Sequence, residues 1–190
     1  MRVIGGHAKG RRLTVPKGQS VRPTAARVKD SLFNILPRSF NGMKVLDLFA
    51  GSGNVSIEAL SRGADEAVLV EASTRSAEAI RENLRRCGCR ERAKLWVAPV
   101  TRTLRALAKS GATFDFIFLD PPYDKGLIGS SIELIAQGHL LSARGTVVAE
   151  HSAREAVLSR YDGLALNDQR HYGDTRLSFF QHAAENESSG

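Results

Sequence analysis

The stretch FDFIFLDPPY, residues 114–123, is an apolar run that breaks into an acid, two prolines and an aromatic residue. This pattern is typical of a buried parallel strand that ends at a rigid loop, because each proline fixes its own φ. The loop would present the Asp120 carboxylate, the Pro121 carbonyl and the Tyr123 ring together at the carboxyl end of a strand, where open α/β sheets bind ligands. Two acceptors and a ring suit a planar substrate with an exocyclic amine. A strand-ending turn with a surface tyrosine would leave the same pattern.

A second stretch of the same layout, KVLDLFAGSG, lies upstream at residues 44–53. A short apolar strand carries Asp47, Gly51 and Gly53 follow it, and a helical pattern begins after them. Glycines let the backbone approach a ligand closely, and the start of a helix offers free N–H groups. The dinucleotide fingerprint would want a third glycine where Ser56 stands, so the pattern favours a nucleoside with a small zwitterionic tail over a pyrophosphate.

Glu71 closes the next apolar run, residues 67–70, and lies 20 residues past Gly51. An acid at this distance can bind both ribose hydroxyls of a nucleoside cofactor. A helix cap near Ser73 is the alternative role. Acids at three strand ends on one sheet edge predict a cofactor site formed by Asp47, Gly51, Gly53 and Glu71.

In this order, these stretches resemble motifs I, II and IV of S-adenosylmethionine-dependent amino-methyltransferases. The ends of the chain resemble the RsmD family, whose members methylate a guanine N2 in bacterial small-subunit ribosomal RNA. That resemblance rests on RVIGG at 2–6, KGRRL at 9–13, RPT at 22–24, RVK at 27–29, LFNIL at 32–36, EHS at 150–152 and YGDT at 172–175. It covers the chain from residue 1 to about residue 181.

The resemblance implies a role for each site residue. Asp120 and the Pro121 carbonyl would accept the two N–H bonds of the guanine amine, Pro122 would stiffen the loop, and Tyr123 would stack on the base. The base would have to be unpaired or flipped out of its helix. On the cofactor side, the resemblance places Asp47 near the amino group of S-adenosylmethionine, Glu71 on its ribose, and Gly51 and Gly53 against it.

The sequence departs from the resemblance after the third predicted strand. Related enzymes often have an acid there that contacts the adenine, whereas this chain has Ala98-Pro99-Val100. We therefore assign no side chain to the adenine and expect backbone and apolar contacts to hold it.

Composition sets the broad class. A chain of 190 residues is long enough for one α/β domain with a full core. It has no apolar stretch of membrane-spanning length, and its start is basic rather than apolar, so we expect a cytoplasmic protein. We expect it to be a monomer. Cys87 and Cys89 are the only cysteines and are interpreted as reduced structural thiols. The five histidines are scattered, so no metal site is predicted. Asp115 is interpreted as structural, and His151 as structural or lining the site.

The positive charge of the chain is concentrated at its start. The net charge is +7, and the first 29 residues hold eight basic residues and no acid, namely Arg2, Lys9, Arg11, Arg12, Lys17, Arg22, Arg27 and Lys29. Such a segment predicts binding to a polyanion, because phosphate contacts supply most non-specific affinity for nucleic acids. A solubilising tail or a localisation signal is the alternative. Apolar β-prone segments around Gly5 to Gly10 predict a hairpin instead of a flexible tail.

The spacing of apolar runs predicts the fold class. Strands near 44–48, 67–70, 94–97, 114–119 and 145–149 alternate with helices near 54–62, 74–87, 101–109 and 127–137. Residues 164–171 and 177–181 predict a closing hairpin. We therefore predict an α/β, Rossmann-like class I methyltransferase fold with a mostly parallel seven-stranded sheet and a reversed edge strand. A basic RNA-binding hairpin (1–22) would precede the methyltransferase domain (23–182), and residues 183–190 would form a disordered tail.

The predicted function is methyl transfer from S-adenosylmethionine to the N2 amine of a specific guanine in 16S rRNA. The RNA-binding residues would be Arg2, Lys9, Arg11, Arg12, Lys17, Arg22 and Arg27. The RNA would be met within a small ribosomal subunit or an assembly intermediate.

Three alternatives stay open. A DNA adenine-N6 methyltransferase shares D-P-P-Y but normally carries a separate target-recognition segment, and only about 67 residues follow Tyr123. A protein-glutamine methyltransferase usually has Asn in place of Asp120, and it would leave the basic segment unexplained. A non-catalytic RNA-binding assembly factor with a vestigial cofactor site is the third alternative.

Overall fold

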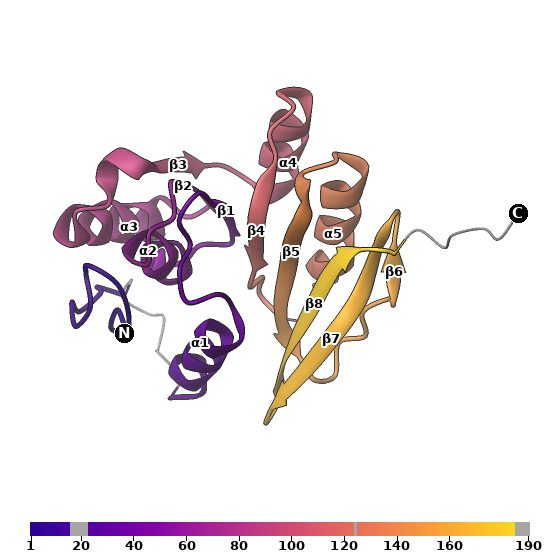
Figure 1. Cartoon of the computed structure of the whole chain (residues 1–190), viewed down its shortest axis with the longest axis horizontal. Helices are drawn as coiled ribbons and strands as arrows, with labels where there is room; N and C mark the ends of the chain where they lie inside the picture. Colours follow the sequence, from indigo (N-terminus) through magenta and orange to yellow (C-terminus); the bar gives the residue numbers. More distant parts are fainter. Residues whose placement is uncertain (16–22, 124, 185–190) are drawn as a thin grey trace, which may run out of the picture.

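Strands and helices alternate along most of the chain (Figure 1). The structure is a computed structural model and describes residues 1–15, 23–123 and 125–184. The elements are α1 (Pro23–Ile35), β1 (Lys44–Leu48), α2 (Asn54–Ser61), β2 (Glu66–Glu71), α3 (Thr74–Cys87), a 3-10 turn (Arg90–Arg92), β3 (Ala93–Val97), α4 (Val100–Lys109), β4 (Phe114–Leu119), α5 (Leu127–Gln137), β5 (Leu141–Ser152), β6 (Arg160–Tyr161), β7 (Leu164–Tyr172) and β8 (Thr175–His182). The strands and helices predicted between residues 44 and 181 are all present, and β5 is longer than predicted at both ends.

The strands form one mixed sheet in the order β3-β2-β1-β4-β5-β8-β7-β6. Strands β1 to β5 are parallel, whereas β8 runs antiparallel to β5 and β7 antiparallel to β8. The prediction was wrong in two details: the two-residue β6 adds an eighth strand, and the reversed strand of the closing hairpin, β8, lies inside the sheet, so that the reversed strand at the edge is β6. Phe179 and Phe180 explain the inner position, because they bury one ring on each face of the sheet.

Helices cover both faces of the sheet. Helices α1, α2 and α3 pack on one face and α4 and α5 on the other, so the molecule has three layers (Figure 1). The core on the first face includes Val28, Ile57 and Ile80, and the core on the second includes Leu104 and Ile132. All eight residues of α2 are buried, which makes this short helix the centre of the first layer.

The first fifteen residues dock against the first layer. Val3, Ala8 and Leu13 are buried members of its core. Arg2 and Arg12 form an isolated antiparallel bridge, and the amide of Val3 donates to the carbonyl of Arg11 over 3.0 Å. The amides of Gly10 and Leu13 also donate to the carbonyls of Val3 and Met1, but regular strands are absent from residues 1–15, so the predicted hairpin is not shown as such. Its remainder, 16–22, lies outside the described residues.

A buried carboxylate holds this N-terminal segment in place. Glu58 of α2 is fully buried and accepts hydrogen bonds from the amides of Ile4 (2.9 Å) and Gly5 (2.7 Å). It also forms ion pairs of 2.9 Å with Lys29 of α1 and with Arg62. Lys29 is one of the eight charges of the basic segment, but its side chain is only 4% exposed. Lys29 is therefore an internal cation that stabilises Glu58 and is not available to an outside ligand.

At the other end, the ordered chain runs past the predicted boundary at residue 182. The amide of Ala183 donates to the carbonyl of Gly163 over 2.8 Å, so Ala183 is tied to the β6–β7 turn. The rest of the predicted tail, from residue 185 onward, lies outside the described residues.

The docking of the N-terminal segment generates a prediction about Gly6. A Cβ at Gly6 would lie 1.7 Å from the carbonyl oxygen of Ser61, whereas a Cβ at Gly10 would meet nothing within 4 Å. Both glycines have positive φ, of +72° and +87°, so both alanine variants carry backbone strain and only Gly6→Ala adds the clash. We expect Gly6→Ala to lower the free energy of unfolding by about 1–3 kcal/mol more than Gly10→Ala does. Urea denaturation measures this difference, and equal losses would contradict the docked geometry.

Candidate active site

Acidic side chains gather at the carboxyl edge of the parallel strands. In β1, Val45 packs in the core beneath α1, α2 and α3 while Leu46 packs in the opposite core, so alternation points Asp47 toward the first face. The same alternation applies to Glu71 at the end of β2, to Asp120 directly after β4, and to Glu150 near the end of β5. Four carboxylates from adjacent strands therefore share one face and one edge of the sheet.

The glycine turn after β1 contains two glycines with different structural roles. Gly51 and Gly53 have φ of +56° and +73°, which side chains rarely adopt. A Cβ at Gly51 would find no atom closer than 3.9 Å, so this side of the turn is open to a ligand. A Cβ at Gly53 would lie 3.1 Å from Leu69 and 3.5 Å from Ile80, so Gly53 is required for packing against β2 and α3.

Glu71 connects the end of β2 to this turn. One carboxylate oxygen accepts from the Gly51 amide (2.9 Å) and the other from the Ser73 amide (2.8 Å). Helix α3 is capped by Ser73, whose hydroxyl accepts from the Ser76 amide over 3.3 Å, and Glu71 contributes to the same helix start through the Ser73 amide, so the alternative role of Glu71 keeps support. Each oxygen of Glu71 keeps a second lone pair for a ligand hydroxyl. The open side of Gly51 and these lone pairs together fit a nucleoside with a free ribose.

Asp47 lies deeper than the other site acids. It is 2% exposed, and its Oδ2 accepts from the Ser56 amide (3.2 Å) and the Ser56 hydroxyl (2.8 Å). Burial raises the pKa of Asp47 to about 7, the bonds from Ser56 oppose this shift, and the charges of Asp120 and Glu71 add to it. Ser56 is the residue that replaces the third glycine of the dinucleotide fingerprint, and its function here is to tie the first turn of α2 to β1. The predicted contact of Asp47 with a cofactor amino group stays a prediction.

The D-P-P-Y loop follows β4 at the same edge of the sheet. Asp120 and Pro122 are exposed, Pro121 is buried and Tyr123 is half-buried. The Tyr123 hydroxyl lies 3.3 Å from Oγ1 of Thr175 at the start of β8, so the loop is fastened to the C-terminal hairpin. Asp120 is thus exposed at the same sheet edge as the glycine turn, and its contact with an acceptor amine stays a prediction.

Glu150 is a site residue for which no role was predicted, although its motif belongs to the resemblance. It lies beside Asp120 at the carboxyl edge, and burial raises the pKa of Glu150 to about 8, with a further rise from the charge of Asp120. Glu150 is thus largely protonated at neutral pH. Glu150 could have been found from the sequence in the same way as the other acids, because it follows an apolar run.

Two other candidates have structural roles. Asp115, at the opposite edge of the sheet, accepts from the Lys44 amide and from the Ser142 hydroxyl, each over 2.8 Å. His151 is fully buried on the face away from Glu150, and its Nε2 lies 2.7 Å from the Ser178 hydroxyl. Of the two interpretations of His151, the structural one therefore holds.

The predicted RNA-binding side chains lie on the surface of the N-terminal segment. Arg2, Lys9, Arg11 and Arg12 are exposed, and so is Arg27 on α1, whereas Lys17 and Arg22 lie outside the described residues. The Arg11 guanidinium donates to the Arg86 carbonyl at the end of α3. Whether these side chains bind RNA stays a prediction.

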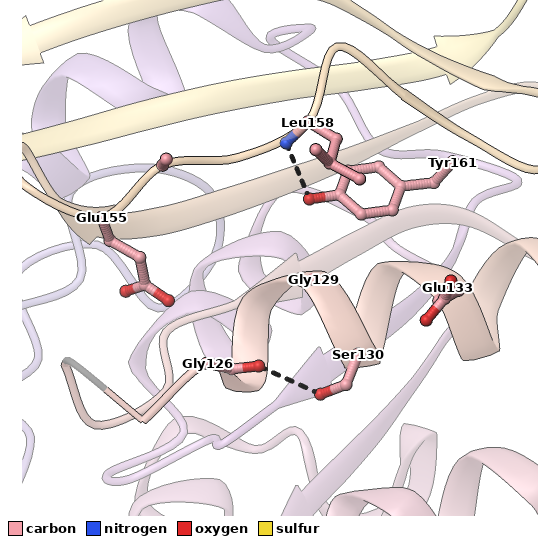
Figure 2. Close-up of a pocket in the computed structure, with 8 residues that line it drawn as sticks. Gly126, Gly129, Ser130, Glu133, Glu155, Leu158 and Tyr161 are labelled. Carbon is pink, nitrogen blue, oxygen red and sulfur yellow. Dashed lines mark hydrogen bonds between the residues drawn. The ribbon is translucent and has the colours of Figure 1, made fainter.

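Other features of the described chain lie outside this edge. Between residues 125 and 184, α5 and the segment after β5 border an open pocket of about 400 Å³, whose lining includes Ser130, Glu133, Glu155 and Tyr161 (Figure 2). None of the predicted site residues lines it. Within the described ranges, no group of three or more His, Cys, Asp or Glu is arranged to hold a metal ion. No described helix is long and apolar enough to cross a membrane.

The fold and the site together define a class of enzyme. The reversed strand next to β5, with the ligand edge formed by a glycine turn and an acid on the following strand, is the arrangement of S-adenosylmethionine-dependent methyltransferases of class I. A family model, Cons_hypoth95, described as conserved hypothetical protein 95, matches residues 1–181. The chain belongs to this family, which is the RsmD family indicated by the sequence motifs.

Individual relatives agree with this assignment over nearly the whole chain. YlbH of Bacillus subtilis (strain 168) is 36% identical over 181 residues, which are 95% of this chain and 98% of YlbH. Ribosomal RNA small subunit methyltransferase D of Escherichia coli (strain K12) is 30% identical over 190 residues, covering 99% of this chain and 93% of that protein. The solved structure of Escherichia coli YhhF has a TM-score of 0.82 at 30% identity and covers 97% of this chain and 99% of that one.

The raised pKa values of the site acids predict how stability depends on pH. The folded state holds a proton on Asp47 up to about pH 7 and on Glu150 up to about pH 8, against ordinary values of 3.8 and 4.5. Each acid therefore contributes stability that is fully present below about pH 4 and is lost as pH rises through its folded pKa. Asp47→Asn and Glu150→Gln keep an acceptor oxygen but cannot ionise. We expect both to lose less unfolding free energy than the wild type between pH 5 and pH 8.5, a range chosen to span these pKa values.

Urea denaturation at the two pH values measures this change. Asp162→Asn, which alters an exposed carboxylate, is the control and should retain the wild-type pH dependence. Identical pH dependence in all four proteins would show that neither site acid is protonated in the folded state.

Proposed function

We propose that this protein transfers the methyl group of S-adenosylmethionine to the exocyclic N2 amine of one guanine in 16S rRNA. The observation that carries the proposal is the exposed Asp120 carboxylate on a fastened loop, at the same sheet edge as the open side of Gly51. A relative that is 30% identical along 99% of this chain is named for methylation of small-subunit ribosomal RNA. An amine acceptor and an RNA substrate are therefore supported by independent observations.

The chemistry requires positioning more than activation. S-adenosylmethionine supplies a methyl group that is already activated on a sulfonium, so the protein has to orient the acceptor and stabilise charge. The Asp120 carboxylate and the Pro121 carbonyl accept the two N–H bonds of the amine, which turns the nitrogen lone pair toward the methyl group. The amine becomes positively charged as the new bond forms, and the carboxylate stabilises this charge. Asp120 is also placed to hold the proton that the amine then releases.

Access to this edge requires an extruded base. The amine of a paired guanine lies inside a helix, so the target has to be single-stranded or flipped. The Tyr123 ring stacks on the base in this proposal, a contact worth about 1–3 kcal/mol. The bond of its hydroxyl to Thr175 supports this role, because it limits rotation of the ring.

The exposed basic side chains of the N-terminal segment bind the RNA phosphates in this proposal. We place the enzyme in the cytoplasm as a monomer, on 16S rRNA within a small subunit or an assembly intermediate. The DNA adenine alternative loses support, because the described residues after Tyr123 form α5 and complete the sheet, and none of them forms a separate recognition domain.

Mass spectrometry of nucleosides from ribosomal RNA tests the proposal. We expect cells that lack the gene to lose N2-methylguanosine at one site of 16S rRNA. The wild-type gene should restore it, and a gene encoding Asp120→Ala should not. An unchanged nucleoside profile in the deletion strain would refute the proposed substrate.

Substitution of Asp120 tests its role in orienting the amine. We expect Asp120→Ala to lower the transfer rate by at least about 100-fold, because it removes a group that stabilises the transition state. Affinity for S-adenosylhomocysteine should be unchanged, because the carboxylate faces the acceptor. Asp120→Asn keeps one acceptor oxygen and should have intermediate activity. Single-turnover kinetics and calorimetry separate the two effects, and normal turnover by Asp120→Ala would exclude the role.

Substitution of Glu71 tests the ribose contact. Glu71→Ala should weaken binding of S-adenosylhomocysteine by about 1–3 kcal/mol, because it removes a charged acceptor and frees the Gly51 amide. Glu66→Ala is the matched control, since Glu66 lies at the opposite end of the same strand and pairs with Lys94. Equal affinities of the two variants in calorimetry would remove Glu71 from the cofactor site.

Charge reversal tests the N-terminal segment. We expect the double variant Arg11→Glu, Arg12→Glu to bind RNA more weakly, with a salt dependence flatter by about 0.7–0.9 of a slope unit for each RNA phosphate that the variant no longer neutralises. Arg144→Glu, an exposed change on the N-terminal half of β5, is the control of equal kind. Wild-type affinity and slope in the double variant would show that this segment is not the RNA-binding surface.

A further inference from the structure

Asn83 of α3 is a fully buried amide that joins the N-terminal segment to the glycine turn. Its Nδ2 donates to the carbonyls of Thr14 (2.8 Å) and Ser52 (2.9 Å), and its Oδ1 accepts from the Thr14 amide (2.8 Å). The amide thus pairs with both backbone groups of Thr14, as a neighbouring strand would, and uses its other N–H on the turn. Figure 1 shows the N-terminal segment, in indigo, beside α3 and α1.

Lys29 forms a second bridge between the same two segments. Its Nζ donates to the Arg2 carbonyl (3.0 Å) and to Oδ1 of Asn54 (2.6 Å), in addition to its ion pair with Glu58. Ser52 and Asn54 stand on either side of Gly53. The N-terminal segment is therefore connected to the glycine turn on both sides of Gly53, through Asn83 to Ser52 and through Lys29 to Asn54.

These bridges make the docked segment and the ordered turn stabilise one another. If the segment left its position, Glu58 would lose two amide donors and Asn83 two of its three hydrogen bonds. Lys29 would lose the Arg2 carbonyl while its charge stayed buried. A buried polar group without a partner is strongly unfavourable, so the turn is held best when the segment is docked.

We propose that Asn83 is a positioning residue that couples RNA binding at the N-terminal segment to cofactor binding at the glycine turn. This inference rests on the proposed function, because it takes the N-terminal segment as the RNA-binding surface. By linkage, each ligand raises the affinity of the other by the same factor, which for coupled sites is about 5- to 150-fold. The enzyme then holds its cofactor most tightly when it is seated on its substrate.

The first test needs no RNA. Amide hydrogen exchange is measured on the wild-type protein with and without S-adenosylhomocysteine, with attention to Thr14, whose N–H is bonded to Asn83. We expect the ligand to slow exchange at Thr14 by about tenfold or more, a factor within the usual range of coupling. Protection of Gly51 and Gly53 with no change at Thr14 would overturn the inference. This measurement holds even if substitutions of Asn83 prevent folding.

The second test measures the coupling directly. Calorimetry gives the affinity for S-adenosylhomocysteine with and without a 16S rRNA transcript, in the wild type and in Asn83→Ala. We expect the ratio of affinities to fall to about one in Asn83→Ala and to stay at the wild-type value in the control, Ser178→Ala. Ser178 is an equally buried group that bonds to His151 and Gln169, on the face opposite the N-terminal segment. A wild-type ratio in Asn83→Ala, or an equal loss in both variants, would overturn the coupling role.

A conservative variant sharpens the result. Asn83→Asp keeps the acceptor for the Thr14 amide but loses both donors, so its coupling should fall as far as in Asn83→Ala. The inference and the proposed function also fail separately. If charge reversal at Arg11 and Arg12 leaves RNA binding unchanged, the segment is not the RNA-binding surface, but S-adenosylhomocysteine should still protect the Thr14 amide from exchange. If RNA binding depends on the two arginines but the Thr14 amide is not protected, the proposed coupling is wrong and the proposed function stands.

Discussion

A single buried carboxylate, that of Glu58, sets the arrangement of the first layer. A carboxylate in a protein core costs several kcal/mol unless it is paired and hydrogen-bonded. The partners of Glu58 come from separate parts of the chain: the amides of Ile4 and Gly5, the ammonium of Lys29 and the guanidinium of Arg62. The N-terminal segment and α1 cannot leave α2 without exposing this charge to an apolar surrounding. Surface arginines carried by the N-terminal segment are thereby held at a fixed position relative to α2 and the glycine turn before it.

The cluster of acids at the carboxyl edge of the sheet depends on a second constraint, the two-residue repeat of pleated strands. Because strands β2, β1, β4 and β5 are parallel neighbours, acids at matching positions near their ends face the same side. Crowding and burial then favour the protonated form of Asp47 and Glu150, as their raised pKa values indicate. A cationic ligand favours the ionised form. Binding of a cationic ligand and deprotonation of Asp47 and Glu150 therefore favour one another.

Much of this architecture could be predicted from the sequence, because apolar runs and the residues that end them are local signals. The glycine turn, Glu71 and the D-P-P-Y loop were found in this way. The position of β8 inside the sheet could not be predicted, because its pairing with β5 depends on residues distant in sequence. Strand β6 could not be predicted either, because two residues are too few to show a pattern. Charge counting included Lys29 in the basic segment but could not show that it is buried with its neighbour Val28 and the nearby Leu32 on the inner side of α1. The packing role of Gly53 depends on Leu69 and Ile80, which only the folded chain brings near.

The inner position of β8 has a consequence for synthesis of the chain on the ribosome. Five parallel strands are complete once Ser152 has emerged, but β5 then lacks its outer partner. That partner, Thr175–His182, follows only after β6 and β7 have been made. Until those residues arrive, β5 presents an unpaired apolar edge of the kind that invites association with other chains. A nascent chain of this enzyme is thus most vulnerable to aggregation in the interval between its fifth strand and its last.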